Sequence, residues 1–269
     1  MNKKLPISAM VVGLNEGNLL DSCLGGMGFV DEIIYVDLES TDNSLEISKK
    51  YTKQIIQHVR VPGVEWIHEE LAPSIKNDWM LMSDPDEVID PVLALEVMEL
   101  FRKGIPENIG AIRVPCFYYF KNYRLKGTPW GGKNSRTLLV HKDKFEFVAK
   151  VHAGGKLKSP YQEIEIASHH DNCVHHYWMQ GFRKLFEKHS RYIGNEGEAR
   201  YFKNLRTNLL TAFKVPFYQF KFAYVTKKGY KDGFLGIFLS LFWAGYQFLA
   251  EIELLKYQLK SQHAAKSPK

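Results

Sequence analysis

The chain has 269 residues, of which 45% are hydrophobic, and a formal net charge of +6. This composition supplies a folded core and argues against a disordered chain. Three scattered cysteines, Cys23, Cys116 and Cys173, argue against a disulfide framework and are typical of a reducing compartment. The N-terminus leads into a strand-like segment without the features of a signal peptide, so we expect a cytoplasmic protein.

The first 84 residues alternate between two apolar patterns. Short apolar runs predict strands at 5–12, 32–36, 54–59 and 79–82. Apolar residues at helical spacing predict helices at 19–27, 44–51 and 66–76, the first of them capped by Asn15. This alternation indicates a doubly wound α/β fold with a mostly parallel sheet. Right-handed crossovers would bring Asn15, Asp37 and Asp84, which follow three of the strands, to one edge of that sheet.

The stretch Asp84-Pro85-Asp86-Glu87 carries the strongest functional signal. Its three carboxylates would repel one another at the end of a buried strand unless a cation lies among them. Carboxylate oxygens suit Mg²⁺ or Mn²⁺, and such an ion also binds a diphosphate. The alternative is a solvated acidic turn in which Asp90 caps the next helix. Neither GxGxxG nor GxxxxGK[ST] occurs, so carboxylates and a metal would have to hold any phosphates.

The second half predicts further elements and a basic loop. We expect an amphipathic helix at 91–103 and strands at 109–114, 117–120 and 174–178. In the Gly-rich loop at 126–136, Lys133 and Arg136 would pair with a diphosphate. The alternative is an exposed basic loop.

Four histidines, His169, His170, His175 and His176, lie around Asp171. Consecutive strand residues point to opposite faces, so His175 and His176 would not share a ligand. We therefore expect a structural role for this cluster rather than a zinc site.

The C-terminal segment is basic, aromatic and then apolar. Residues 201–231 hold seven Lys or Arg and no Asp or Glu, so this segment carries +7 and the rest of the chain −1. Bases interleaved with aromatics suit single-stranded nucleic acid or an anionic membrane surface. The charge-free run at 233–250 favours the membrane and argues against nucleic acid. Monotopic insertion, a true span and a buried helix remain open, and Lys227, Lys228 and Lys231 would face the cytoplasm.

Three motifs occur in sequence order: Gly13-Leu14-Asn15-Glu16 after the first strand, IYVDLESTDNS at 34–44, and DWMLMSDPDE at 78–87. Together they resemble family 2 glycosyltransferases of the GT-A fold. The resemblance is closest to the bacterial subgroup that builds lipopolysaccharide core, O-antigen and capsule, and by motif it covers residues 5–195. The tail resembles, less specifically, the membrane-associating C-terminal region of that subgroup.

This resemblance implies roles for individual residues. Asn15 and Glu16 would line the nucleoside pocket, and Asp37 would accept a hydrogen bond from the base. Asp84 would contact the ribose or the nucleoside side, and Asp86 would bind the Mn²⁺ or Mg²⁺ that bridges the diphosphate.

The acceptor side of the family pattern is matched less completely. The segment ending at His152 resembles a strand that ends in Val-His, which makes His152 a further metal ligand. The family commonly continues with Glu, whereas this chain has Ala153, so the catalytic base is in doubt. The candidates for the base are Asp171, Glu163 and Glu165.

We therefore expect a nucleotide-sugar-binding half at 1–125, an acceptor-binding half at 126–195 and a membrane-associating tail at 196–269, which could also pair two copies. The predicted activity is an inverting, metal-dependent sugar transfer from a nucleotide diphosphate, UDP by resemblance. The acceptor would be a hydroxyl of a cell-surface glycan or lipid-linked molecule at the cytoplasmic face of the membrane. The alternatives are a non-catalytic scaffold of the same fold, which Ala153 leaves open, and a nucleotidyltransferase, which would need a basic phosphate loop after the first strand.

Overall fold

The computed structural model describes residues 4–132, 134–149 and 155–266. The chain divides into two compact units, one of residues 1–117 and 133–178 and the other of residues 118–132 and 179–269. The second unit therefore joins the C-terminal helices to a loop from the middle of the chain. The expected boundaries at 125 and 195 divide the chain in sequence order, so they do not group this loop with the C-terminal helices.

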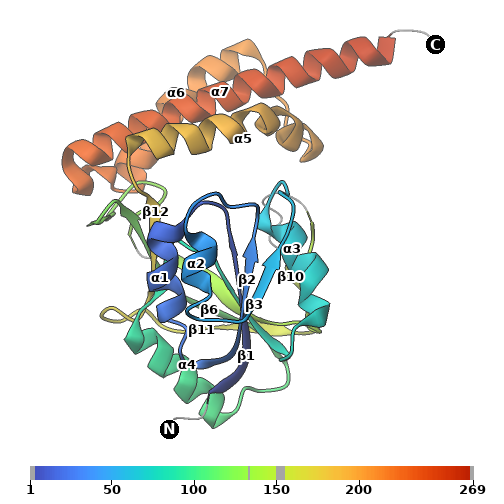
Figure 1. Ribbon diagram of the computed structural model, residues 1–269. Coiled ribbons are helices and arrows are strands. Elements are labelled where there is room, and N and C mark those ends of the chain that lie inside the picture. Colours follow the sequence, from blue (N-terminus) through green and yellow to red (C-terminus); the bar gives the residue numbers. More distant parts are fainter. Residues whose placement is uncertain (1–3, 133, 150–154, 267–269) are drawn as a thin grey trace. The chain divides into compact units, whose positions relative to one another are not determined.

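The first unit begins with strands and helices in alternation. These elements are β1 (Leu5–Gly13), α1 (Gly17–Gly25), β2 (Val30–Asp37), α2 (Ser44–Ser48), β3 (Gln54–Gln57), α3 (Val64–Leu71), a 3-10 turn η1 (Ala72–Ser74) and β4 (Trp79–Ser83). After them come β5 (Glu87–Ile89), α4 (Pro91–Lys103), β6 (Ile109–Phe120), β8 (Asn134–His141), β9 (Phe145–Glu146), β10 (Lys156–Leu157), β11 (Gln162–Glu165) and β12 (Val174–Met179). Figure 1 shows α1 and α2 on one side of β1–β3 and α3 on the other.

The main sheet has the strand order β3-β2-β1-β4-β8-β6-β12-β5, with β11 and the short β7 (Tyr123–Arg124) paired to β6. The strands β3, β2, β1 and β4 are parallel, and β8 joins them antiparallel to β4. The predicted α/β class is confirmed. The parallel half of this sheet is the half that the alternating pattern predicted.

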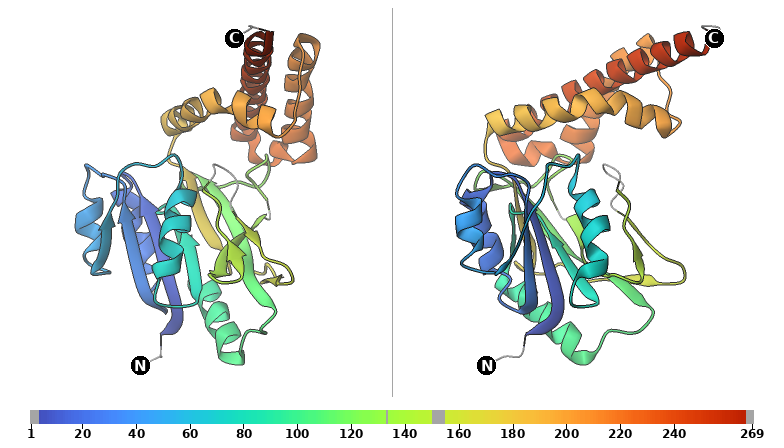
Figure 2. Two further views of the ribbon diagram at one scale, coloured as in Figure 1. Left: turned by 90° about the vertical axis from the view of Figure 1, so that its right-hand side faces the viewer. Right: turned by 45° about the vertical axis from the view of Figure 1, so that its right-hand side comes forward.

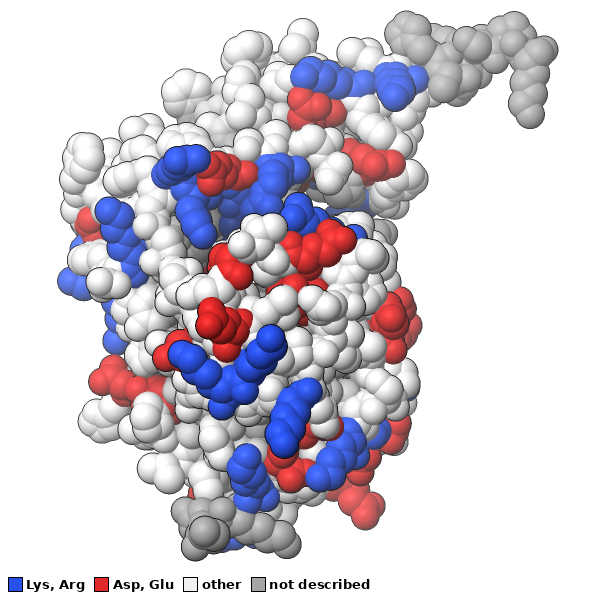
Figure 3. Space-filling view, in the orientation of Figure 1, with Lys and Arg blue, Asp and Glu red and all other residues white. Residues whose placement is uncertain are grey.

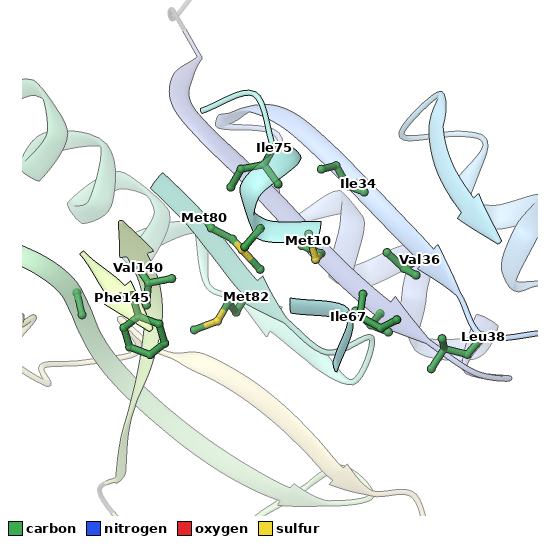
Figure 4. Packing of buried hydrophobic residues seen from close by; sticks show 13 residues of the cluster. Met10, Ile34, Val36, Leu38, Ile67, Ile75, Met80, Met82, Val140 and Phe145 are labelled. Carbon is green, nitrogen blue, oxygen red and sulfur yellow. The ribbon is translucent and has the colours of Figure 1, made fainter. Parts of the chain in front are cut away.

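A hydrophobic cluster fills the space between α3 and the sheet (Figure 4). Ile67 and Ile75 pack there against Met10 of β1 and Met80 of β4, and all four are almost fully buried. Side chains on both faces of β1 are buried, which is why its sequence is a near-continuous apolar run.

Two elements differ from the sequence-based expectation. The helix expected to reach residue 76 ends at Leu71 and continues as the turn η1, because Pro73 has no N–H for a helical hydrogen bond. The two strands expected at 109–114 and 117–120 form one strand, β6. Pairing of Pro115 with Ser135 and of Cys116 with Asn134 on β8 continues the ladder through the proline.

The second unit is mainly helical. Its helices are α5 (Phe182–Phe202), α6 (Leu209–Lys221), the π-helical turn η2 (Phe222–Thr226), the 3-10 turn η3 (Gly229–Asp232) and α7 (Gly233–Lys266). Helices α5 and α6 both pack against α7 (Figure 2). At Gly197 of α5 a Cβ atom would lie 2.4 Å from the carbonyl oxygen of Glu253 on α7, so only glycine permits this close approach.

A buried carboxylate fixes the 126–132 loop within this unit. Asp232, which is 6% exposed, accepts hydrogen bonds from the backbone N–H groups of Lys126 and Gly127, both at 2.7 Å. A Cβ at Gly127 would lie 2.1 Å from the carbonyl oxygen of Lys228. Further along the loop, Trp130 packs edge-on against Trp243 of α7. The loop is therefore a packed part of the helical unit.

The second unit also carries most of the exposed apolar surface and the positive charge. Among the described residues, all the exposed large hydrophobic side chains except Val59, Val92 and Leu95 belong to it. The segment Gly229–Ser261 is long and apolar enough to cross a membrane, and one such helix is weak evidence by itself. The unit has 19 Lys or Arg and 6 Asp or Glu, a net +13, which leaves 6 − 13 = −7 for the other unit. Figure 3 shows Lys and Arg gathered over the region of α5.

Candidate functional site

The carboxyl ends of β1, β2 and β4 lie side by side. Gly13 pairs with Asp37 in register, and Val11 pairs with Ser83. Asn15, Asp37 and Asp84 therefore lie at the same edge of the sheet, as predicted. A Cβ at Gly13 would lie 2.8 Å from the Tyr35 hydroxyl and 2.9 Å from Pro85 Cγ. Glycine at this position therefore allows the acidic turn to approach the end of β1.

Asn15 connects the loops after β1 and β2. Its side-chain oxygen accepts hydrogen bonds from the N–H groups of Thr41 at 2.7 Å and Asp42 at 3.3 Å, and its own backbone is left-handed at φ 56°. Asn15 is not the predicted helix cap, because α1 has Glu16 at that position and no side-chain cap. Instead, Asp42 accepts a hydrogen bond from the N–H of Gly17 at 3.0 Å.

Asp37 is fully buried at the end of β2. Its carboxylate accepts hydrogen bonds from the N–H of Ser40 at 3.1 Å and the Tyr35 hydroxyl at 3.5 Å. Burial raises the pKa of Tyr35 to about 12, so this hydroxyl stays protonated and able to donate. Asp37 therefore holds the loop that carries Ser40 against the strand.

Residues Asp84 to Glu87 form a tight turn. The N–H of Glu87 donates to the carbonyl of Asp84 at 3.0 Å, and Pro85 occupies the second position, where its fixed φ suits such turns. The Glu87 carboxylate is 1% exposed and accepts hydrogen bonds from the Ser83 hydroxyl and the Asp84 N–H at 3.3 and 3.1 Å. The same carboxylate forms an ion pair with Arg136. Glu87 therefore stabilises the turn through its contacts with Ser83, Asp84 and Arg136.

Asp86 and Asp90 each contact a histidine of β12. Asp86 is 8% exposed, and its carboxylate lies 3.3 Å from Nε2 of His176. His175 points to the other face, where Nε2 lies 3.2 Å from Asp90, so the predicted opposite orientation of the two histidines is confirmed. Asp90 also accepts a hydrogen bond from the N–H of Val92 and caps α4.

A cavity of about 470 Å³ adjoins this turn within the first unit. Its lining combines both signs of charge: Asp84, Glu65 and Glu163 are acidic, and Arg113, Arg136 and Lys156 are basic. Arg136 donates a hydrogen bond to the carbonyl of Met82 at 3.0 Å, which fixes its guanidinium at the end of β4. Arg136, which was predicted to meet a diphosphate from a loop, therefore lies on β8 and lines the same cavity as Asp84.

No functional role was assigned from the sequence to Glu65, His68, Arg113 and Lys156, which line the cavity, or to His176, which contacts Asp86. His68 lies on α3, and burial together with the charge of Arg136 lowers its pKa to about 4. The sequence did not indicate a functional role for His68, because a histidine next to Ile67 is typical of an ordinary half-buried helix face.

Part of the predicted ligand set lies outside the described residues. These positions are Lys133 and His152, and Ala153, which replaces the glutamate of the family pattern, also lies outside them. Across 4–132, 134–149 and 155–266, no group of three His, Cys, Asp or Glu is arranged to hold a metal ion. The donor chemistry of Asp84 and Asp86 nevertheless suits a hard divalent cation, because both present carboxylate oxygens at one strand end.

The base candidates are distributed over two places. Asp171 lies in an exposed turn before β12, and the pairing of Val174 with Ile89 and of His176 with Glu87 puts it at the opposite end of that strand from the acidic turn. Glu163 on β11 lines the cavity and lies 4.0 Å from Arg113. The structure therefore brings Glu163, and not Asp171, to the cavity that contains Asp84.

The depressed pKa of His68 predicts a loss of stability in acid. Its folded-state value of about 4 lies below the ordinary 6.5, so the unfolded state takes up the proton first as the pH falls. The stabilisation is complete above pH 6.5 and disappears towards pH 4, with an expected size of roughly 3 kcal/mol. Urea unfolding of the wild type and His68→Gln at pH 7 and 4.5 measures this difference. Equal pH dependence in both proteins would contradict it.

The chain is similar to proteins named uncharacterized glycosyltransferases. That of Rickettsia bellii is 22% identical over 269 residues, which cover 97% of this chain and 90% of the relative, and that of Rickettsia conorii is 24% identical over 278 residues, covering 99% and 96%. No protein-family model matches the chain. Among solved structures, glucosyl-3-phosphoglycerate synthase from Mycobacterium tuberculosis in complex with Mn²⁺ and UDP-glucose is 21% identical with a TM-score of 0.34. That match covers 42% of this chain and 43% of the synthase chain, which is less than half of either. The relatives that span nearly the whole chain confirm the predicted enzyme class, a glycosyltransferase.

Proposed function

We propose that this protein is an inverting, family 2 type glycosyltransferase that uses a UDP-sugar and a divalent cation. The observation that carries this proposal is the acidic turn at the carboxyl edge of the sheet, next to a cavity lined by opposite charges. Ligands of open α/β sheets bind at this edge. The acceptor is a hydroxyl of a cell-surface glycan or lipid-linked molecule, of the lipopolysaccharide or capsule type.

The donor nucleotide is proposed to bind across the ends of β1, β2 and β4. Asn15, Glu16 and Asp37 line the nucleoside side, and Asp84 meets the ribose. Arg136 and Lys133 face the diphosphate, and support comes from the position of Arg136 in the cavity that Asp84 lines. Guanidinium groups bind phosphate oxygens through paired, charge-assisted hydrogen bonds, so Arg136 also stabilises the charge that develops on the leaving group.

Asp86 is proposed to hold Mn²⁺ or Mg²⁺, with Asp84 beside it and His152 as a further ligand. The cation supplies charge neutralisation on the diphosphate. Asp84 has the more direct access, because it lines the cavity, whereas Asp86 is 8% exposed and contacts His176.

The transfer is a single in-line displacement. A carboxylate takes the proton from the acceptor hydroxyl, and the oxygen bonds to the anomeric carbon opposite the leaving group. The bond from that carbon to the phosphate oxygen breaks, and UDP leaves with the electron pair, so the configuration inverts. Glu163 is the base that the geometry favours, because it lines the same cavity as Asp84.

The helical unit is proposed to hold the enzyme on the cytoplasmic face of an anionic membrane. This proposal is supported by the coincidence of a net +13 with nearly all the exposed large hydrophobic side chains in one unit. Apolar burial and attraction to anionic lipid act together in such peripheral binding. A second copy of the chain could cover part of the same apolar surface.

Titration of UDP into the detergent-solubilised protein, with and without Mn²⁺, tests the donor site. We expect metal-dependent binding that Asp86→Asn weakens by a factor of about 100 or more, since a carboxylate ligand and its charge are lost. Asp78→Asn is the matched control, because Asp78 is exposed at the other end of β4 and pairs with Lys142. UDP binding without metal, or UDP binding of equal affinity in Asp86→Asn, would contradict the proposed metal dependence. Binding with no sugar transfer would favour the non-catalytic scaffold.

A further inference from the structure

The helical unit contains a second, apolar cavity that the sugar-transfer reaction does not use. It lies between α5 and α7 and has a volume of about 680 Å³, within the range of sites that bind small molecules. Its lining is made mainly of carbon surfaces, which include Phe186 and Ile193 from α5 and Phe238, Phe242 and Leu249 from α7.

The polar groups of this lining are already engaged within the unit. Nδ1 of His189 lies 2.8 Å from the carbonyl of Leu185, and burial lowers the pKa of this histidine, which favours its neutral form. The Ser190 hydroxyl donates to the carbonyl of Glu187 at 3.0 Å, and the Tyr246 hydroxyl donates to Glu196 at 2.9 Å. A sugar or nucleotide would lose its hydrogen bonds to water here without replacement, whereas a hydrocarbon chain would not.

The rim of the cavity is also apolar. Phe186 is 54% exposed, Leu241 57% and Leu249 51%. The lining thus continues into the exposed apolar surface of the unit, which is larger than isolated surface hydrophobics would explain. The +13 charge of the same unit complements an anionic headgroup.

We propose that this cavity binds one hydrocarbon chain of an anionic membrane phospholipid. The chain lies against the aromatic rings of α5 and α7, and the headgroup meets the basic surface of the same unit. The site is separate from the donor site and does not depend on the identity of the donor or the acceptor.

Gly245 offers a way to close the cavity without disturbing its walls. It lines the cavity on α7, and a Cβ at this position would have no atom within 4 Å. Gly194 on α5 has the same open surroundings and lies outside the lining, which makes it a matched control. Both substitutions remove a glycine from a helix interior, where glycine is unfavourable, so both variants should fold.

The experiment compares wild type, Gly245→Phe and Gly194→Phe on vesicles of phosphatidylcholine and phosphatidylglycerol. The phosphatidylglycerol carries a diazirine in its acyl chain, and cross-linked peptides are mapped by mass spectrometry after irradiation. We expect labels on the lining segments of α5 and α7 in wild type and Gly194→Phe. In Gly245→Phe these labels should fall to background, while co-sedimentation with the vesicles and labelling of the exposed α6 residue Phe217 persist.

Equal labelling of the lining segments in Gly245→Phe and wild type would overturn the proposal. The same holds for labels spread evenly over all the exposed apolar helix faces. Equal labelling with a diazirine-bearing phosphatidylcholine in vesicles without phosphatidylglycerol would overturn the preference for an anionic lipid. UDP binding, measured on the same three proteins, tests the donor site separately.

Discussion

Glu87→Ala is expected to destabilise the protein by about 3–5 kcal/mol, because it leaves the guanidinium of Arg136 in a largely buried site without its carboxylate partner. The substitution also removes the acceptor for the N–H of Asp84 and for the Ser83 hydroxyl, so the acidic turn loses its internal support. Urea unfolding gives the change in free energy. UDP titration of the folded fraction should show a loss of binding, although Glu87 itself does not line the cavity.

Glu99→Ala is the control for the loss of a glutamate ion pair. Glu99 is 45% exposed and pairs with Arg102 and Lys103 on the surface of α4, so its removal should cost less than about 1 kcal/mol. If Glu87→Ala lowered the free energy of unfolding as little as this control, the contacts of Glu87 would not be what stabilises the turn. A second variant, Glu87→Gln, keeps the shape of the side chain and should recover part of the stability, because an amide oxygen still accepts hydrogen bonds.

The second large effect is expected for Asp232→Ala. This change leaves the N–H of Gly127, which is in a buried hydrogen bond, and the N–H of Lys126, which is in a partly buried one, without their acceptor, and we expect a loss of about 3 kcal/mol. The loop between residues 126 and 132 should then become sensitive to proteases. Limited proteolysis with mapping of the cleavage sites, alongside urea unfolding, tests both statements.

Glu253→Ala is the comparison for Asp232→Ala within the same unit. Glu253 is 30% exposed and pairs with Lys256 one turn along α7, so its loss should be small and should leave the loop protected. Cleavage within residues 126–132 in the comparison variant, or an intact loop in Asp232→Ala, would show that the loop is held by other contacts, such as that of Trp130 with Trp243.

The sequence predicted the parts of the fold that depend on local pattern. The run from Leu5 to Gly13 is apolar on both faces because helices cover both sides of the sheet at β1 (Figure 1), and this produces a strong strand signal. The acidic turn was equally visible, since Asp84, Pro85 and Asp86 follow a buried strand directly. Both patterns lie within about ten consecutive residues, so they can be recognised in the sequence without knowledge of the tertiary structure.

The missed features depend on contacts between distant segments. Asp232 and Lys126 are more than a hundred residues apart, and nothing in the sequence GYKDGFLG at 229–236 indicates which loop Asp232 will bind. The approach of His176 to Asp86 likewise requires the pairing of β12 with β5. The alternation of faces along β12 correctly separated His175 from His176, but it could not identify the partner of either.

The opposite charges of the two units have a mechanical consequence at an anionic surface. The surface attracts the unit of net +13 and repels the unit of net −7, so the two forces act as a torque as well as an attraction. On the anionic membrane proposed above, such a torque would favour an orientation in which the acidic unit is turned away from the lipid. Mobile ions shorten its reach to about 8 Å at physiological ionic strength, so the orientation is selected during the last step of approach.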